Sequence, residues 1–133
     1  MLDKKEEYRI GVLLVMHDPM LLETTADCLN FQGGLNIETA LSTDEAETKM
    51  KKTKPDVVVC DLDMPLTNSF DFLKKLREKG DKTPLIFLAA NGEKELTIKA
   101  QCLGANGSVE KYGDPNVVYP TLKKCIVSVI RKR

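Results

Sequence analysis

The run VVVCDLDMP, residues 57–65, holds the most informative pattern in this chain. Its apolar residues follow one another without alternation, which indicates a strand buried on both faces, as in a parallel sheet. Two carboxylates, Asp61 and Asp63, come where that strand ends. In open α/β sheets this edge is the ligand-binding side, so we expect Asp61 to be open to solvent there, with no need to bury its charge.

Four further segments have the pattern of strands. Two are continuous apolar runs, at residues 10–16 and 85–90, and two are weaker, at 36–41 and 107–110. Helical patterns separate these segments, and one more helix follows the last of them. Strict alternation of strand and helix predicts right-handed βαβ units and therefore a doubly wound, five-stranded parallel α/β sheet with helices on both faces.

The expected helices have their own start signals, stop signals and apolar stripes. Glycines at positions 33–34, 80 and 104 are expected to end three of them. The expected N-caps are Asp18 before Pro19, Ser42 in a capping box with Glu45, Ser69 and Asn91. The expected buried stripes are Leu22, Ala26 and Leu29; Ala46 and Met50; Phe72, Leu73 and Leu76; Leu96, Ala100 and Leu103; and Leu122, Ile126 and Val129.

The last helix contains one local conflict. If it began at Asp114 and Pro115, Pro120 would lie beyond the first turn and remove a backbone hydrogen bond, at a cost of about 3 kcal/mol. We therefore predict that this helix begins near Pro120 or is kinked there.

Composition limits the classes of function. The 133 residues suit one domain, and no repeat or linker divides them. Because 20 Lys+Arg balance 20 Asp+Glu, no overall field favours nucleic acid or an acidic membrane, and the short ending 131–133 indicates a solvated helix end. Four widely spaced cysteines and a charged N-terminus without a membrane-length apolar run predict a cytoplasmic protein with reduced thiols.

Four segments resemble response-regulator receiver domains. PDVVVCDLDMP is similar to their third strand, VLLVMHDP to the first strand and its acidic turn, PLIFLAA to the fourth strand, and GANGSVEKY to the fifth strand with its lysine. The likeness spans residues 9–129 as one receiver domain. It implies a flavodoxin-like sheet in the order 2-1-3-4-5 with five helices.

The same resemblance implies a function in two-component phosphorelay signalling. Asp61 corresponds to the aspartate that accepts a phosphoryl group from a histidine kinase or phosphotransfer protein, and Lys111 to the lysine that pairs with it. The chemistry agrees, since a carboxylate can attack phosphorus only where cations, a lysine and normally a magnesium ion, neutralise the transferring group.

Other positions depart from the family pattern. The two acids that usually hold magnesium correspond to Met16 and His17, and because magnesium prefers oxygen ligands we expect weak magnesium binding. Ala89 replaces the usual hydroxyl after the fourth strand, and Ser108 replaces the switch aromatic. Tyr112 stands where the family commonly has a proline. These departures indicate an atypical receiver with a degenerate acidic pocket.

Three neighbours of Asp61 have more than one interpretation. Asp63 is a second carboxylate ligand or a solvated loop charge, with equal support for both. Asp18 fits an N-cap better than a metal ligand. His17, the single histidine, fits a hydrogen-bonded structural residue better than a general base, a soft-metal ligand shared with Asp61, or a pH switch.

Two functions are compatible with these residues. In the first, phosphorylation of Asp61 alters a protein-interaction surface near the fourth helix, fifth strand and fifth helix, which is also the first place to expect a homodimer. In the second, the degenerate fold is a protein-binding module that works without phosphorylation. A flavin or cobalamin enzyme is disfavoured because the turn MHDPML offers no phosphate cradle.

Overall fold

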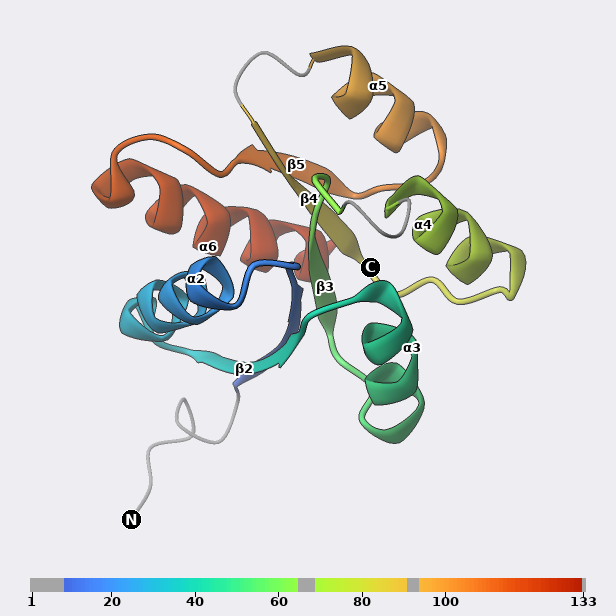
Figure 1. Cartoon of the computed structure of the whole chain (residues 1–133), viewed down its shortest axis with the longest axis horizontal. Helices are drawn as coiled ribbons and strands as arrows, with labels where there is room; N and C mark the ends of the chain where they lie inside the picture. Colours follow the sequence, from blue (N-terminus) through green and yellow to red (C-terminus); the bar gives the residue numbers. More distant parts are fainter. Residues whose placement is uncertain (1–8, 65–68, 91–93, 133) are drawn as a thin grey trace.

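The computed structural model describes residues 9–64, 69–90 and 94–132, and strands alternate with helices throughout them (Figure 1). In chain order the elements are β1 (Ile10–Val15), α2 (Pro19–Gln32), β2 (Leu35–Ala40), α3 (Thr43–Lys52), β3 (Val57–Asp61), α4 (Ser69–Glu78), β4 (Leu85–Ala89), α5 (Lys94–Cys102), β5 (Gly107–Glu110) and α6 (Pro115–Arg131).

The strands form one parallel sheet in the order β2-β1-β3-β4-β5. The predicted fold and strand order are therefore confirmed. The register pairs Val15 with Cys60 and Ala89 with Glu110, so the strands end together at one edge of the sheet. The winding direction reverses between β1 and β3, which is the place where open α/β sheets bind ligands.

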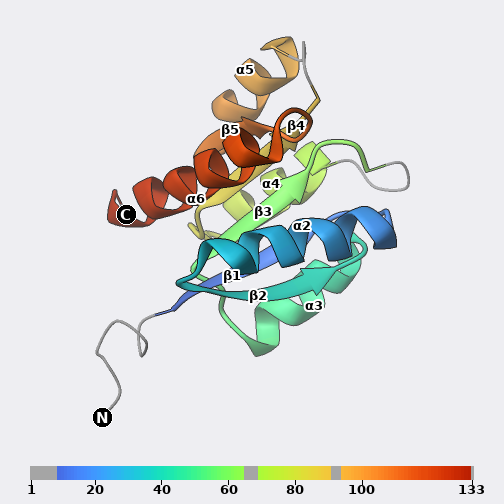
Figure 2. The same ribbon diagram turned by 90° about the vertical axis from the view of Figure 1, so that its left-hand side faces the viewer.

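Helices cover both faces of this sheet (Figures 1 and 2). Helices α2 and α6 pack on one face, and α3, α4 and α5 pack on the other. Val57 and Val59 belong to the first core, whereas Val58 and Cys60 belong to the second. This division explains why the run VVVC is apolar without alternation. None of the helices in the described part of the chain is long and apolar enough to cross a membrane.

The predicted caps of the first two helices are present. The Asp18 carboxylate accepts hydrogen bonds from two backbone N–H groups in the first turn of α2, and Ser42 Oγ accepts one from the Glu45 N–H at 3.0 Å. The Glu45 side chain accepts from the N–H of Leu41 at 3.4 Å, so the return half of the predicted capping box is shifted by one residue.

The predicted stripe of α5 is only partly buried. Ala100 is buried, but Leu96 is 39% exposed, so its predicted burial is wrong. Leu103 packs at the edge of the second core. The predicted cap Asn91 lies outside the described residues. The short helix α5 therefore contributes less to the core than its pattern indicates.

The last helix begins earlier than predicted. It starts at Pro115 with Asp114 as its cap and runs through Pro120, so the predicted start near Pro120 is wrong. The lost backbone hydrogen bond costs free energy. Packing favours the longer helix, because Val118 before the proline is buried in the same stripe as Leu122 after it.

Candidate functional site

A buried ion pair lies at the carboxyl edge of the sheet. Lys111 Nζ donates to Asp61 Oδ1 at 2.8 Å and to Asp61 Oδ2 at 3.0 Å. The Asp61 side chain is 1% exposed and that of Lys111 is 6% exposed. The structure thus brings together the two residues that sequence reasoning paired. The expectation that Asp61 is open to solvent is wrong, because the lysine side chain covers it.

The sheet sets the position of both partners. Asp61 is the last residue of β3, and Lys111 follows β5, two strands away. The Lys111 N–H donates to the Ala89 carbonyl at 2.9 Å, which extends the pairing of β5 with β4 to this residue. The lysine backbone is therefore fixed, and its long side chain reaches back across the end of β4 to the carboxylate.

Further groups contact the charged atoms of Asp61 and Lys111. The Asp63 N–H donates to Asp61 Oδ1 at 2.9 Å, and Lys111 Nζ lies 5.1 Å from the centre of the Tyr112 ring. Burial lowers the pKa of Lys111, but the hydrogen bond and charge of Asp61 outweigh burial, so this pKa lies above its ordinary value of 10.5. Lys111 is therefore a cation at physiological pH.

A buried hydroxyl ties the site to helix α4. Ser69 begins α4 and its Oγ donates to the Asp61 carbonyl at 2.8 Å, so its predicted role as an N-cap is wrong. Cys60 Sγ lies 3.9 Å from Ser69 Oγ, and burial raises the pKa of the Cys60 thiol to about 12. Sequence reasoning missed this link, because nothing in the sequence distinguishes a cap from a contact to the strand.

The turn after β1, residues 16–18, lies beside the Asp61–Lys111 pair, and each of its three side chains has different surroundings. Met16 is buried in the first core, and Asp18 is fully used as the cap of α2. His17 is exposed and forms no hydrogen bond with another residue that the structure describes. The prediction of a hydrogen-bonded structural histidine is therefore wrong.

The residues around Asp61 are a poor set of magnesium ligands. Asp63 is exposed, Met16 offers only a buried thioether, and the Asp61 oxygens are held by Lys111. Within the described ranges, no three side chains of His, Cys, Asp or Glu gather as a metal site would require. Magnesium prefers an octahedral shell of oxygens, and this arrangement does not fit it.

Ala89 and Ser108, which the resemblance associates with signal transmission, carry small side chains. Ala89 is buried at the end of β4 and has no hydroxyl. Ser108 lies on β5, with its Oγ 3.4 Å from Thr97 Oγ1 of α5. The contact between β5 and α5 at this point is therefore a pair of hydroxyls rather than a packed aromatic ring.

A family model now identifies this arrangement. The response regulator receiver domain model matches residues 12–123. The chain belongs to the response regulator receiver domain family. Such domains are non-enzymatic modules of two-component signalling, the family typically binds magnesium, and a histidine kinase is the partner that they imply.

Individual relatives agree with this family. The chain is 33% identical over 118 residues to the probable transcriptional regulator ycf29 of Porphyra purpurea, a match that covers 87% of this chain and 56% of the relative. It is 34% identical over 91 residues to the Fimbriae Z protein of Salmonella typhimurium, covering 66% and 43% of the two chains. The receiver chain spans about half the length of the curated relatives it matches.

Solved structures share the fold. The chemotaxis response regulator CheY4 of Vibrio cholerae superposes with a TM-score of 0.77 at 27% identity, over 88% of this chain and 98% of that one. A response regulator receiver domain protein from Clostridium thermocellum gives a TM-score of 0.80 at 22% identity, over 92% and 95%. The receiver fold therefore extends over nearly all of this chain.

Proposed function

We propose that this receiver domain, residues 9–129, accepts a phosphoryl group on Asp61 from a histidine kinase or phosphotransfer protein. The observation that carries the proposal is the contact of Lys111 Nζ with both Asp61 oxygens, at 2.8 and 3.0 Å. An aspartate and a lysine brought together from β3 and β5 at a sheet edge form the minimal charge arrangement for this transfer.

The pair has to open for the transfer to occur. An Asp61 oxygen attacks phosphorus, the bond from phosphorus to the donor's imidazole nitrogen breaks, and its electron pair returns to that nitrogen. Asp61 is 1% exposed, so Lys111 must first swing off the carboxylate. Its ammonium group then pairs with the incoming phosphoryl oxygens, so the cation again has an anionic partner.

The degenerate positions limit the magnesium dependence and the output. With Met16 and His17 in place of two acids, we propose weak magnesium binding, with Asp61, Asp63 and His17 as the groups nearest to any metal. Ala89 has no hydroxyl to draw toward a phosphoryl oxygen, so coupling to the surface of α5, β5 and α6 is weak. That surface exposes apolar side chains, including Ile98 at 60%, and is where a homodimer of the phosphorylated domain is expected.

A second function has its own supporting observation. The Asp61 oxygens already accept three hydrogen bonds, from Lys111 and the Asp63 N–H, so the carboxylate is satisfied without metal or phosphate. A pocket locked in this way suits a protein-binding module that works without phosphorylation.

One experiment separates the two functions. The protein is incubated with acetyl phosphate or beryllofluoride, with magnesium and separately with manganese, and followed by intact mass and amide NMR. The first function predicts one added phosphoryl group, or shifted amides around Asp61, that disappear in Asp61→Asn and persist in the control Asp27→Asn, at an exposed carboxylate of α2. No response with either metal would favour the second function.

A further inference from the structure

The two edge strands of the sheet differ in length. Strand β5 forms one edge and has four residues, whereas β2 forms the other edge and has six. An edge strand presents unpaired backbone N–H and C=O groups on which another strand can add, and a short edge limits this risk. The longer β2 edge, which contains the β-branched residues Ile37 and Thr39, is therefore the side of the sheet that most needs protection.

The pairing of β2 with β1 shows which backbone groups of β2 face outward. The Gly34 carbonyl accepts from the Ile10 N–H at 3.0 Å, and the Ala40 carbonyl accepts from the Met16 N–H at 3.1 Å. Because successive residues of a strand direct their backbone groups to opposite sides, the even-numbered residues of β2 pair with β1. The odd-numbered residues of β2, and Leu41 just after the strand, therefore direct their N–H and C=O groups to the free edge.

An ion pair of α3 occupies the carboxyl end of this free edge. Lys49 Nζ donates to the Thr39 carbonyl, and Glu45 Oε2 accepts from the Leu41 N–H at 3.4 Å. The two side chains lie four residues apart on one side of the helix, and Glu45 Oε1 is 3.2 Å from Lys49 Nζ. One donor and one acceptor, joined to each other, thus meet the outward carbonyl and the outward N–H on either side of Ala40.

This ion pair has the hydrogen-bonding pattern of one residue of a sixth parallel strand. In a parallel ladder, a residue opposite Ala40 would donate its N–H to the carbonyl before Ala40 and accept from the N–H after it. Lys49 supplies that donor and Glu45 supplies that acceptor. Complete sets of outward groups then remain only at Leu35 and Ile37, which is too short an edge for an added strand of about five residues.

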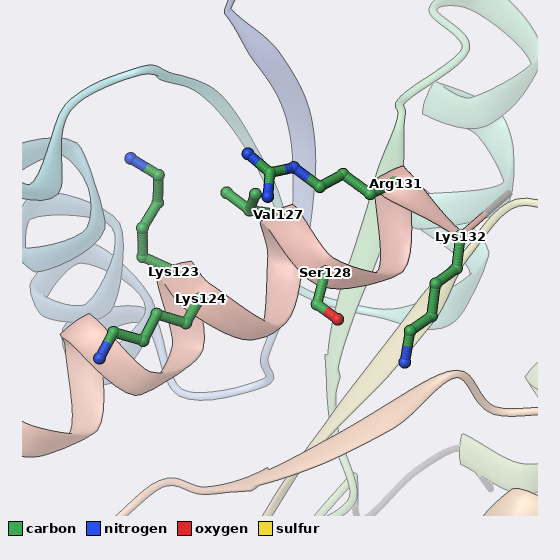
Figure 3. Close-up of a pocket in the computed structure, with 6 residues that line it drawn as sticks. All are labelled: Lys123, Lys124, Val127, Ser128, Arg131 and Lys132. Carbon is green, nitrogen blue, oxygen red and sulfur yellow. The ribbon is translucent and has the colours of Figure 1, made fainter.

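Charged side chains elsewhere on the surface are arranged differently. Figure 3 shows Lys124, Arg131 and Lys132 pointing in different directions around a shallow groove of about 410 Å³ on α6. None of the three has an ion-pair partner among the described residues. Glu45 and Lys49, which are 41% and 32% exposed, are held by the edge of the sheet as well as by each other. Since an exposed ion pair alone adds little stability, the contacts with β2 indicate another role.

We propose that the Glu45–Lys49 ion pair closes the free edge of β2 and prevents the β2 strand of a second copy from adding to the sheet. A second copy is the occupant to exclude, because every copy carries the same edge, and two such edges can pair about a twofold axis into one continuous sheet. A strand that added in either direction would need the outward groups that the ion pair already holds. The proposal does not depend on phosphorylation of Asp61.

The test removes the ion pair in E45A/K49A, the opened variant. Alanine favours helix, and Ser42 still caps α3 through the backbone N–H of residue 45, so α3 should stay folded. In dilute protein, the Leu41 amide should exchange about tenfold faster than in the wild type, whereas the Ala40 amide, which faces β1, should not change. Sedimentation velocity at about 0.5 mM protein should show self-association at least tenfold tighter than that of the wild type.

Two matched variants show whether the edge is responsible. E47A/K51A removes the same two charges at the same spacing on α3, and neither side chain bonds to β2 within the described part of the chain, so association should not change. Adding Thr39→Pro to the opened variant removes an outward N–H and leaves the pairing with β1 intact. It should return association to the wild-type level within about threefold, and circular dichroism checks that each variant is folded.

Amide exchange of the opened variant locates the contact without the proline variant. The outward amides of Ile37 and Thr39 should become more protected as the protein concentration rises from about 0.02 to about 0.5 mM, because they enter the new strand pairing. Three results would overturn the proposal: an opened variant that associates no more tightly than the wild type, an equal effect of the control pair on α3, and association that leaves these two amides unprotected.

Discussion

Asp61 and His17 follow neighbouring strands at the same edge of the sheet, yet their surroundings are opposite. Asp61, at the end of β3, is 1% exposed, and its carboxylate accepts hydrogen bonds from Lys111 and from the Asp63 N–H. His17, just beyond β1, is exposed and has no hydrogen-bond partner in the described part of the chain. The strand end fixes where each side chain lies, and the groups that cover the side chain determine its exposure and its hydrogen bonds.

The difference comes from what reaches over each strand end. Lys111 arrives from β5 and supplies one positive charge to one negative charge. Next to β1, the acid that follows the strand is Asp18, which caps α2. Two acids after β1 would gather negative charge beside Asp61 and need a metal ion, whereas Lys111 already balances the charge of Asp61, the one buried carboxylate among the residues that the structure describes. Four substitutions test that contrast.

The largest effect is expected from Met16→Asp, which introduces an acid at a buried position. Met16 is 1% exposed in the first core, so the change removes apolar packing and buries a carboxylate next to Asp61. We expect a loss of about 4 kcal/mol in the free energy of unfolding. Urea unfolding with and without magnesium measures it, and part of the loss should be regained with magnesium.

Met16→Leu is the matched control for this change. It keeps the apolar volume and should cost less than about 1.5 kcal/mol. Equal losses in the two variants would show that packing alone is responsible, and that the buried charge contributes nothing.

The next largest effect is expected from Lys111→Met, which leaves Asp61 without its cation. Stranding one partner of a buried ion pair should cost about 3 kcal/mol at pH 7, measured by urea unfolding. Lys124→Met, at an exposed lysine without an ion pair, should change stability by less than about 0.5 kcal/mol.

The loss of stability in Lys111→Met has a predictable pH dependence. The pKa of Lys111 is raised in the folded state above its ordinary value of 10.5, so its stabilising contribution is complete below pH 10.5 and is lost as the pH rises through the folded value. The stability difference between wild type and Lys111→Met should therefore be constant from pH 7 to 10 and shrink above 10.5. A difference that stayed constant to pH 12 would contradict the ion pair.

A smaller effect is expected from Ser69→Ala. This change removes the 2.8 Å hydrogen bond from the Ser69 hydroxyl to the Asp61 carbonyl and should cost about 1 kcal/mol. If the bond also ties α4 to the site, amide exchange in the first turn of α4 should accelerate relative to β3. Ser128→Ala, at an exposed hydroxyl on α6, is the control and should alter neither quantity.

The fold could be predicted from the sequence because it rests on local signals, and the pairing of Asp61 with Lys111 was implied by the resemblance to receiver domains. Buried strands have continuous apolar runs, and parallel strand ends meet at one edge. The burial of Asp61 could not be predicted from the sequence, because it depends on the side-chain path of Lys111, 50 residues away. The start of α6 was missed since a proline penalty is local, whereas the packing of Val118 that outweighs it is tertiary.

The smallest effect on stability, and the most direct test of the contrast, is expected from His17→Asp. His17 is exposed, so an aspartate there should change the free energy of unfolding by less than about 0.5 kcal/mol. The register pairs Val15 with Cys60, which places residue 17 just beyond the strand next to that of Asp61. An aspartate at this exposed position would therefore add an oxygen ligand near Asp61. Magnesium affinity should rise about tenfold, or about 1.4 kcal/mol, followed through the amide signal of Asp63 during a titration. His17→Asn supplies a similar shape without the charge and should gain much less. If both variants bind magnesium as weakly as the wild type, then Lys111, rather than the missing acid, is what keeps the metal from Asp61.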